Sequence, residues 1–282
     1  MILISVIVPT LNRPKLLLDL VKKLNPIIKK EHEVIFVDDS INCQKNEIAQ
    51  IARFNFQYIH RGVPNGVSSA RNQAIKYSKG EYLIFLDDDD DFTEEWLSDF
   101  ETQLPSKTDL VYCDMVTISP NGEKSELRSF GKHRATVIPG SWMIRKFLFM
   151  EIGGFDERLK FGENTELFFR IDRKKPSVSF IQKNNFIYKP SIDGGSKSLK
   201  NAIESNLIVL EKHGDLLSNH IKHLYHQVIG VNFIRFRRFR EAQDHLWIAY
   251  KLKPRKISTL IRFLISMLPI LAKRLYSEEV KV

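Results

Sequence analysis

Tyr82-Leu-Ile-Phe-Leu86 is followed by five consecutive aspartates, Asp87 to Asp91, and then by Phe92. A short, wholly apolar run of this kind predicts a strand buried on both faces, as in a parallel sheet. Five adjacent carboxylates repel one another, so they need a metal ion, basic partners or open water. Ligands of open α/β sheets bind beyond the carboxyl ends of the strands, which places this run at an expected binding site. The alternative is a solvated acidic turn that leads into a helix capped by Thr93.

The chain before the aspartates alternates between strand-like and helical segments. Strands are predicted at 2–8, 33–37, 56–60 and 82–86, and helices at 15–30, 46–54, 68–79 and 93–103. This alternation is typical of right-handed βαβ units, so it predicts an α/β fold with a mostly parallel sheet flanked by helices. After residue 110 the pattern predicts short strands at 110–113, 115–118, 178–181 and 186–188, and a helix at 167–173.

The four predicted parallel strands all end in residues that form hydrogen bonds. The ends read Pro9-Thr10-Leu11-Asn12-Arg13, Asp38-Asp39-Ser40, His60-Arg61-Gly62 and the aspartate run. Carboxyl ends of parallel strands meet at one edge of a sheet, so these residues are expected to line a single binding crevice.

Composition places the protein among globular intracellular proteins. The chain has 282 residues, 43% of them hydrophobic, and only two cysteines, which argues for a reducing compartment without a disulfide framework. The first residues lack a basic segment and a cleavage site, so they predict a strand and not a signal peptide. Because no run of eighteen apolar residues occurs, no membrane span is expected. The expected location is cytoplasmic, with contact to the inner face of the membrane as an option.

The positive charge is confined to the last third of the chain. Residues 1–196 contain 27 Lys+Arg and 27 Asp+Glu, whereas residues 197–282 contain the remaining 16 Lys+Arg and 7 Asp+Glu. This asymmetry predicts a separate basic helical region at 197–282 that meets an anionic surface.

Five motifs together resemble the family 2 glycosyltransferases of the GT-A fold. They are Val6-Ile-Val-Pro-Thr-Leu-Asn-Arg13, Val37-Asp-Asp-Ser40, Asn65-Gly-Val-Ser-Ser-Ala-Arg-Asn72, Phe85-Leu-Asp-Asp-Asp-Asp90 and Gly153-Gly-Phe-Asp-Glu157. Each motif alone is weak, but five in the order and spacing of the family are specific. The resemblance covers roughly residues 2–195. It implies a GT-A domain at 1–196, with a nucleotide half at 1–110 and an acceptor half at 111–196, followed by the helical extension.

The resemblance implies a nucleoside-diphosphate sugar as donor, with UDP as the family's usual nucleotide. Pro9, Thr10 and Leu11 are then expected against the nucleoside. Asp39 is expected to accept a hydrogen bond from the base, as a carboxylate can. Arg71 is expected to reach the nucleotide from the start of a helix, unless it is an ordinary solvated arginine.

The same resemblance implies a divalent cation, Mn²⁺ or Mg²⁺, at the aspartates. Asp87 and Asp88 are expected near the ribose and Asp89 on the metal, since hard cations favour carboxylate oxygens. Members of the family often complete the metal site with a histidine in the loop after Tyr188, where this chain has Lys189-Pro-Ser-Ile-Asp-Gly-Gly-Ser196. Asp193 can replace that histidine, although an ordinary loop is the favoured interpretation.

Inverting transfer requires a base that takes the proton of the acceptor hydroxyl. The family places an Asp directly after a Glu at the position of Glu163-Asn164, and an amide cannot accept that proton. Glu163 is therefore the expected catalytic base, with Glu166 one turn along as the alternative. Glu163 can equally be an acidic residue that stabilises a helix N-terminus.

The region 197–282 predicts helices at 198–213, 219–240 and 257–275. His220, His223 and His226 are expected on a helix surface, and no nucleic-acid partner is expected because no recognised binding module surrounds the arginines. The segment 254–276 is apolar and basic. It is expected either to pack on protein, including in a homodimer, or to lie on anionic lipid, and lipid is the favoured interpretation.

These features predict an inverting glycosyltransferase that transfers a sugar to a hydroxyl of a glycan or lipid-linked acceptor in bacterial-type surface polysaccharide synthesis. The alternative is a non-catalytic sugar-nucleotide-binding or scaffold subunit of a glycan-assembly complex, which Asn164 favours. Phosphotransfer through Asp87 is less consistent, since that chemistry places its aspartate on the first strand. Sugar-nucleotide synthesis would need a glycine-rich loop after strand one, which is absent.

Overall fold

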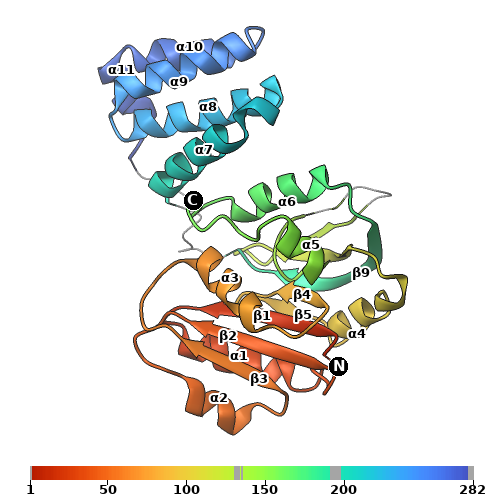
Figure 1. The fold of residues 1–282 in the computed structure, drawn as a ribbon. Helices are drawn as coiled ribbons and strands as arrows, with labels where there is room; N and C mark the ends of the chain where they lie inside the picture. Colours follow the sequence, from red (N-terminus) through yellow and green to blue (C-terminus); the bar gives the residue numbers. More distant parts are fainter. Residues whose placement is uncertain (1, 130–133, 135, 191–197, 279–282) are drawn as a thin grey trace. The chain divides into compact units, whose positions relative to one another are not determined.

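The computed structural model describes residues 2–129, 134, 136–190 and 198–278. The described residues form two compact units (Figure 1). The sheet unit comprises those within 1–157 and 163–192, and the helical unit those within 158–162 and 193–282. Cys43 is exposed and Cys113 is buried, and both are free thiols.

Strands and helices alternate through the first part of the sheet unit, as the sequence predicts. The elements are β1 (Ile4–Thr10), α1 (Pro14–Leu24), β2 (His32–Asp38), α2 (Lys45–Ile51), β3 (Phe56–His60), α3 (Val67–Tyr77) and β4 (Tyr82–Phe85). They are followed by β5 (Asp91–Phe92), α4 (Trp96–Glu101), a 3₁₀ turn (Leu104–Ser106), β6 (Leu110–Ile118) and β7 (Lys124–Leu127). The unit ends with β8 (Trp142–Arg145), α5 (Lys146–Glu151), α6 (Glu163–Arg173) and β9 (Val178–Tyr188).

The described strands form one nine-stranded sheet with the order β3-β2-β1-β4-β8-β6-β9-β5, and β7 pairs with β6. The pairs β1–β2, β1–β4, β2–β3 and β6–β9 are parallel. The pairs β4–β8, β5–β9, β6–β7 and β6–β8 are antiparallel. The predicted α/β fold is confirmed, with its parallel strands concentrated in the first half of a mixed sheet.

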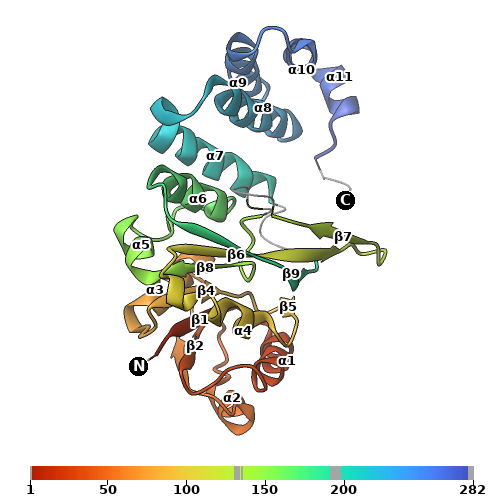
Figure 2. The same cartoon turned by 90° about the vertical axis from the view of Figure 1, so that its right-hand side faces the viewer.

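Both faces of the sheet are buried because successive side chains on a strand point to opposite faces. On β4, Tyr82 and Ile84 join the core that contains α1 and α4, whereas Leu83 and Phe85 join the core that contains α3, α5 and α6. Figure 2 shows α5 and α6 on the side of β6, β8 and β9 opposite to α4. The apolar run at 82–86 is therefore a doubly buried strand, as predicted.

The predicted helix at 93–103 starts three residues late. Asp91 and Phe92 instead form β5, which pairs with β9, and the N–H of Thr93 donates to the carbonyl of Asn185 at 3.0 Å. Helix α4 begins only at Trp96, with Glu95 and not Thr93 in the capping position. Pairing with a strand almost a hundred residues later overrides the local helical pattern here. The paired short strands predicted around residues 114 and 183 are single strands, β6 and β9, with an irregular register at Asp114.

The helical unit contains α7 (Leu199–His213), a 3₁₀ turn (Gly214–Leu216), α8 (Asn219–Arg235), α9 (Phe239–Leu252), α10 (Ile257–Ser266) and α11 (Pro269–Leu275). The predicted helix at 219–240 divides into α8 and α9 because Arg237 adopts a left-handed φ of 60°. Pro269 likewise separates α10 from α11, because proline lacks the N–H that would continue α10. No helix in the described part of the chain is long and apolar enough to cross a membrane.

Candidate active site

The carboxyl ends of four parallel strands lie side by side. Thr10 of β1 is in register with Asp38 of β2, and Asp38 is in register with His60 of β3. On the other side of β1, the N–H of Leu86 donates to the carbonyl of Ile7 at 3.0 Å. The predicted meeting of these strand ends at one sheet edge is confirmed.

The aspartate run begins with a turn that Asp90 closes from inside. The carboxylate of Asp90 accepts a hydrogen bond from the N–H of Asp87 at 2.7 Å, and the N–H of Asp90 donates to the carbonyl of Asp87 at 3.2 Å. Burial raises the pKa of Asp90 well above its usual value, and the charge of Asp87 raises it further. Asp90 thus holds the backbone of the turn in place.

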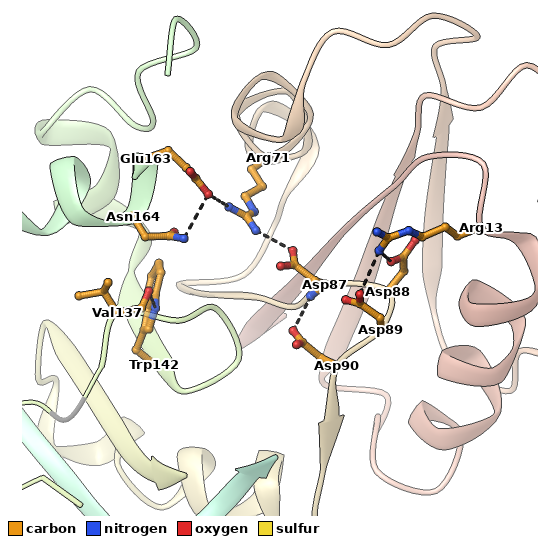
Figure 3. Close-up of polar contacts among 10 residues, drawn as sticks. All are labelled: Arg13, Arg71, Asp87, Asp88, Asp89, Asp90, Val137, Trp142, Glu163 and Asn164. Atoms are coloured by element: carbon orange, nitrogen blue, oxygen red, sulfur yellow. Dashed lines mark hydrogen bonds and ion pairs between the residues drawn. The ribbon is translucent and has the colours of Figure 1, made fainter. Parts of the chain in front are cut away.

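Asp88 and Asp89 share one guanidinium, that of Arg13. Arg13 Nη1 lies 3.0 Å from Asp88 Oδ1 and 3.0 Å from Asp89 Oδ2 (Figure 3). The hydroxyl of Thr10 donates to Asp88 Oδ2 at 2.6 Å. Burial raises the pKa of Asp88 to about 6, although the bonds from Thr10 and Arg13 act in the opposite direction. Asp88 is therefore enclosed, whereas the side chain of Asp89 keeps 32% of its surface exposed.

Arg71 joins the aspartate turn to helix α6. Its Nη2 lies 2.6 Å from Asp87 Oδ1 and its Nη1 lies 3.5 Å from Glu163 Oε1, as Figure 3 shows. The side chain is only 1% exposed, so the alternative of a solvated helix arginine is wrong. Burial lowers the pKa of Arg71, but Asp87 and Glu163 outweigh that effect and raise it above the ordinary value.

Two of the quoted motifs meet beneath Arg71. The side-chain amide of Asn72 donates to the carbonyl of Phe155 at 2.9 Å and accepts from its N–H at 2.9 Å. This places the Phe155 ring 5.3 Å from the Arg71 guanidinium, within cation–π range. Gly154 allows this approach, because a Cβ there would lie 2.8 Å from Asn72 Oδ1 at a φ of +68°.

Asp39 is held by an arginine from the neighbouring strand. Arg61 binds it through Nε and, at 2.6 Å, through Nη2, and the N–H of Asn65 donates to Asp39 Oδ2 at 3.1 Å. A carboxylate offers about four acceptor positions, so one remains for a ligand. Both side chains are nearly buried, which fixes the orientation of Asp39 at the sheet edge.

The two candidate bases have different environments. Glu163, at the start of α6, is 16% exposed, and Asn164 Nδ2 donates to its Oε1 at 3.2 Å. Asn164 Oδ1 is buried and has no hydrogen-bond partner among the described residues. Glu166 is fully buried, with its oxygens 2.9 and 2.7 Å from Arg170 nitrogens. Because Arg170 holds Glu166 inside the unit, the geometry favours Glu163 over Glu166.

The structure thus brings Thr10, Asp87, Asp88, Asp89 and Glu163 into one connected set, through Arg13 and Arg71. Asp39 lies two strands from β4 and connects to this set through the backbone, where its N–H donates to the carbonyl of Thr10 at 3.0 Å. Pro9 is buried in β1, and Leu11 is 42% exposed just beyond it.

Three residues of this site were missed from the sequence. Arg13, Arg61 and Asp90 all stand inside motifs that the sequence singles out. The partners of Arg13 and Arg61 follow other strands, whereas Asp90 bonds to Asp87 within its own turn. The fifth aspartate, Asp91, belongs elsewhere, since it pairs with Lys23 at 2.9 Å and Lys189 at 2.8 Å.

The aspartates fit a cation that is shared with phosphates better than a complete protein cage. No group of three or more His, Cys, Asp or Glu side chains within the described ranges is arranged to hold a metal ion. Mg²⁺ typically takes only one or two carboxylates together with substrate phosphates. The partly exposed carboxylate of Asp89 suits that role, and Asp193 lies outside the described residues.

The fold of this chain is similar to that of solved structures. The crystal structure of S. aureus TarS 1-349 superposes with a TM-score of 0.65 at 20% identity, covering 96% of this chain and 88% of that one. The complex of the same protein with UDP-GlcNAc superposes with a TM-score of 0.64 at 18% identity, covering 96% and 88% of the two chains. These likenesses confirm the GT-A fold.

The model of Glycosyl transferase family 2 matches residues 5–172, and the chain belongs to that family. It is 29% identical over 243 residues to the Bacillus subtilis minor teichoic acid biosynthesis protein GgaB, covering 77% of this chain and 27% of the relative. It is 28% identical over 184 residues to an uncharacterized Haemophilus influenzae glycosyltransferase, covering 60% and 62%. It is 35% identical over 101 residues to the Escherichia coli putative colanic acid biosynthesis glycosyl transferase WcaA, covering 35% and 36%. The chain therefore spans between 27% and 62% of the length of these relatives.

Proposed function

We propose that this protein is an inverting glycosyltransferase that transfers a sugar from a UDP-sugar to a hydroxyl of a glycan or lipid-linked acceptor. Membership of family 2 supports the reaction class. Relatives named for teichoic acid and colanic acid biosynthesis support a role in surface polysaccharide synthesis. The TarS complexes with UDP-GlcNAc and UDP support a uridine nucleotide donor.

The observation that carries the proposal is the chain of contacts from Glu163 through Arg71 to Asp87. It ties a carboxylate on the acceptor side to the turn that would receive the donor. A base and a leaving group on opposite sides of the anomeric carbon are what inversion requires. The buried guanidinium of Arg71 contacts both groups and so fixes the position of Glu163 relative to the aspartate turn.

Residues at the ends of the parallel strands bind the donor. Asp39 accepts a hydrogen bond from the base through its remaining acceptor position, with Pro9, Thr10 and Leu11 beside the nucleoside. Asp87, whose side chain is 38% exposed, lies beside the ribose, and Asp88 next to it orients Thr10 and Arg13. Asp89 would hold a divalent cation, Mg²⁺ or Mn²⁺, which would supply positive charge for the departing diphosphate.

Glu163 acts as the catalytic base. Its carboxylate accepts the proton of the acceptor hydroxyl as that oxygen attacks the sugar. Arg71 and the Asn164 amide both bind Oε1, so they orient the group and leave Oε2 available to the acceptor. Asn164 is a positioning residue in this scheme.

The test replaces Glu163 by Gln, which keeps the shape and removes the proton acceptor. Turnover of UDP-sugar is expected to fall roughly 10²- to 10⁴-fold. Binding of UDP with Mn²⁺, read as a concentration-dependent rise in melting temperature, is expected to stay unchanged. The matched control is Glu151→Gln, since Glu151 also pairs with one cation, Lys174, but lies away from the aspartate turn.

Two outcomes would contradict the proposal that this protein is a glycosyltransferase with Glu163 as its base. Full turnover by Glu163→Gln would show that Glu163 is not the base. A wild-type protein that binds UDP but transfers no sugar, and gains turnover on Asn164→Asp, would establish the non-catalytic donor-binding subunit instead.

A further inference from the structure

Helices α10 and α11 bury their small residues and expose their large aliphatic ones. Thr259, Ser266 and Ala272 are completely buried. Thr259 donates to the side-chain oxygen of Gln227 on α8 at 2.9 Å, and the Ser266 hydroxyl donates to the Phe263 carbonyl. Ile270, in contrast, is 88% exposed. A helix that packs on a core normally does the reverse.

The exposed aliphatic residues follow a helical spacing. Six of them are called the apolar face, namely Ile257, Ile261, Leu264, Leu268, Leu271 and Leu275, and Met267 and Ile270 are exposed as well. Within α10 the steps are four and three residues, and within α11 the step is four, so in each helix the members share one side. Exposed apolar faces of this kind mark an interaction site.

Basic residues accompany the apolar face in the sequence, and acidic ones are absent from the segment. Residues 251–276 contain seven Lys or Arg and no Asp or Glu. Arg255, Lys256, Lys273 and Arg274 are exposed, and none of them pairs with a carboxylate within the described part of the chain. The surface therefore combines unmatched positive charge with unmatched aliphatic area.

This combination selects the partner. A second copy of the chain would bring the same positive charge to the same face, and like charges across an interface repel. A nucleic acid would match the charge but not the aliphatic side chains. The surface of an anionic bilayer matches both, since its headgroups attract Lys and Arg while its acyl boundary accepts apolar side chains.

We propose that α10 and α11 dock the protein on anionic membrane surfaces. The apolar face enters the boundary between headgroups and acyl chains, and Lys and Arg on both sides contact lipid phosphates. The helices lie in the plane of the membrane, because neither is long enough to span it. This surface does not depend on the proposed sugar transfer, and its test reads binding alone.

The experiment measures co-sedimentation of the full chain with vesicles. One set contains phosphatidylcholine only, and the other contains phosphatidylcholine with phosphatidylglycerol. Binding is expected to be at least about tenfold tighter to the anionic set and to weaken at high salt, because salt screens the headgroup charge.

Two double variants separate the contributions. Lys273→Glu with Arg274→Glu is expected to weaken binding to anionic vesicles by at least about 25-fold, since each basic residue near the surface contributes about a factor of five. Leu264→Gln with Leu268→Gln is expected to weaken it by at least about tenfold through lost apolar insertion. The matched controls are Lys200→Glu and Leu216→Gln, exposed residues of the same unit outside α10 and α11 that should leave binding unchanged. Unchanged circular dichroism would confirm that each variant is folded.

Four results would overturn the proposal. One is equal binding to neutral and anionic vesicles. Another is wild-type binding by both double variants. The third is sedimentation equilibrium that shows a dimer which Leu264→Gln with Leu268→Gln dissociates, because the apolar face would then belong to a second copy. An adventitious phosphate interaction would appear as binding that inorganic phosphate abolishes while the leucine variant leaves it unaffected, which also contradicts docking.

Discussion

The sheet unit and the helical unit depart from ordinary burial in opposite directions. At the edge of the sheet, the guanidinium of Arg71 is 1% exposed and lies among carboxylates. In α10 and α11, hydroxyl groups are inside and Ile270 is 88% exposed. Charged residues are rarely fully buried and large apolar patches are rarely exposed, so each departure marks a surface with a use.

The buried arginine has its partners inside the protein, whereas the exposed apolar residues have none there. A buried charge must be balanced inside the protein, since desolvation without a partner is expensive. Arg71 has Asp87 and Glu163 for that purpose. An exposed aliphatic face lowers the stability of the isolated protein little, and its partner must be another molecule. Substitutions should therefore destabilise the first region and leave the stability of the second almost unchanged.

The largest effect is expected from Arg71→Met. It leaves Asp87 and Glu163 without their shared cation, and breaking a pair of this type costs roughly 3 kcal/mol. Urea denaturation should show that loss in the free energy of unfolding. Arg145→Met removes an exposed pair with Glu81 and should cost less than about 1 kcal/mol. Equal losses of unfolding free energy for the two variants would contradict the claim that the buried pairs of Arg71 contribute more than an exposed pair.

A smaller effect is expected from His226, which is half-buried on α8 beside His245. Their Nδ1 atoms are 3.0 Å apart. Burial, followed by the charges of His245 and Lys222, lowers the pKa of His226 from 6.5 to about 4. The pKa of His245 is lowered as well, by burial, although Asp244 opposes this.

The sign of the pH dependence follows from this lowered pKa. Below about pH 6.5 the unfolded chain takes up a proton that the folded helical unit resists, so stability present above that value is lost as the pH falls toward about 4. Because His226 is partly exposed, the loss is roughly 1 kcal/mol. The melting temperature of the wild type should fall relative to that of His226→Gln as the pH falls through this range. Parallel curves would contradict the assignment.

The smallest effect is expected from Ile261→Gln in α10. The side chain is 50% exposed, so the free energy of unfolding should change by less than about 0.5 kcal/mol. Leu246→Ala, at a fully buried position of the same unit, should cost roughly 2–5 kcal/mol. A large loss from Ile261→Gln, measured by thermal denaturation, would mean that the apolar face stabilises the protein itself.

Local patterns predicted most of the sheet because they have direct structural causes. The wholly apolar run at 82–86 reflects two buried faces, and the strand ends meet because parallel strands share a direction. Long-range pairing defeated the local pattern at Asp91 and Phe92, which join β9. It also defeated the prediction for His223, which is buried with Nδ1 2.8 Å from the Ala249 carbonyl of α9 and not on a helix surface.

The site was predictable as a set of strand ends but not as a network. Nothing near Asp39 in the sequence indicates that Arg61 binds it, because the two meet only when β2 and β3 pair. The five aspartates look equivalent in sequence, yet Asp90 is buried beneath the turn and Asp91 pairs with lysines. Those differences arise from the turn that follows β4, and a run of identical residues contains no signal for it.

One contact described above has a mechanical consequence. Arg71 and Glu163 are 92 positions apart in the chain, and Asp87 lies between them in sequence. The side chain of Arg71 therefore fixes the distance between the first half of the sheet unit and the start of α6. Any shift of α6 along the sheet would lengthen the Arg71–Glu163 contact. The two halves must therefore move together, or this contact must break.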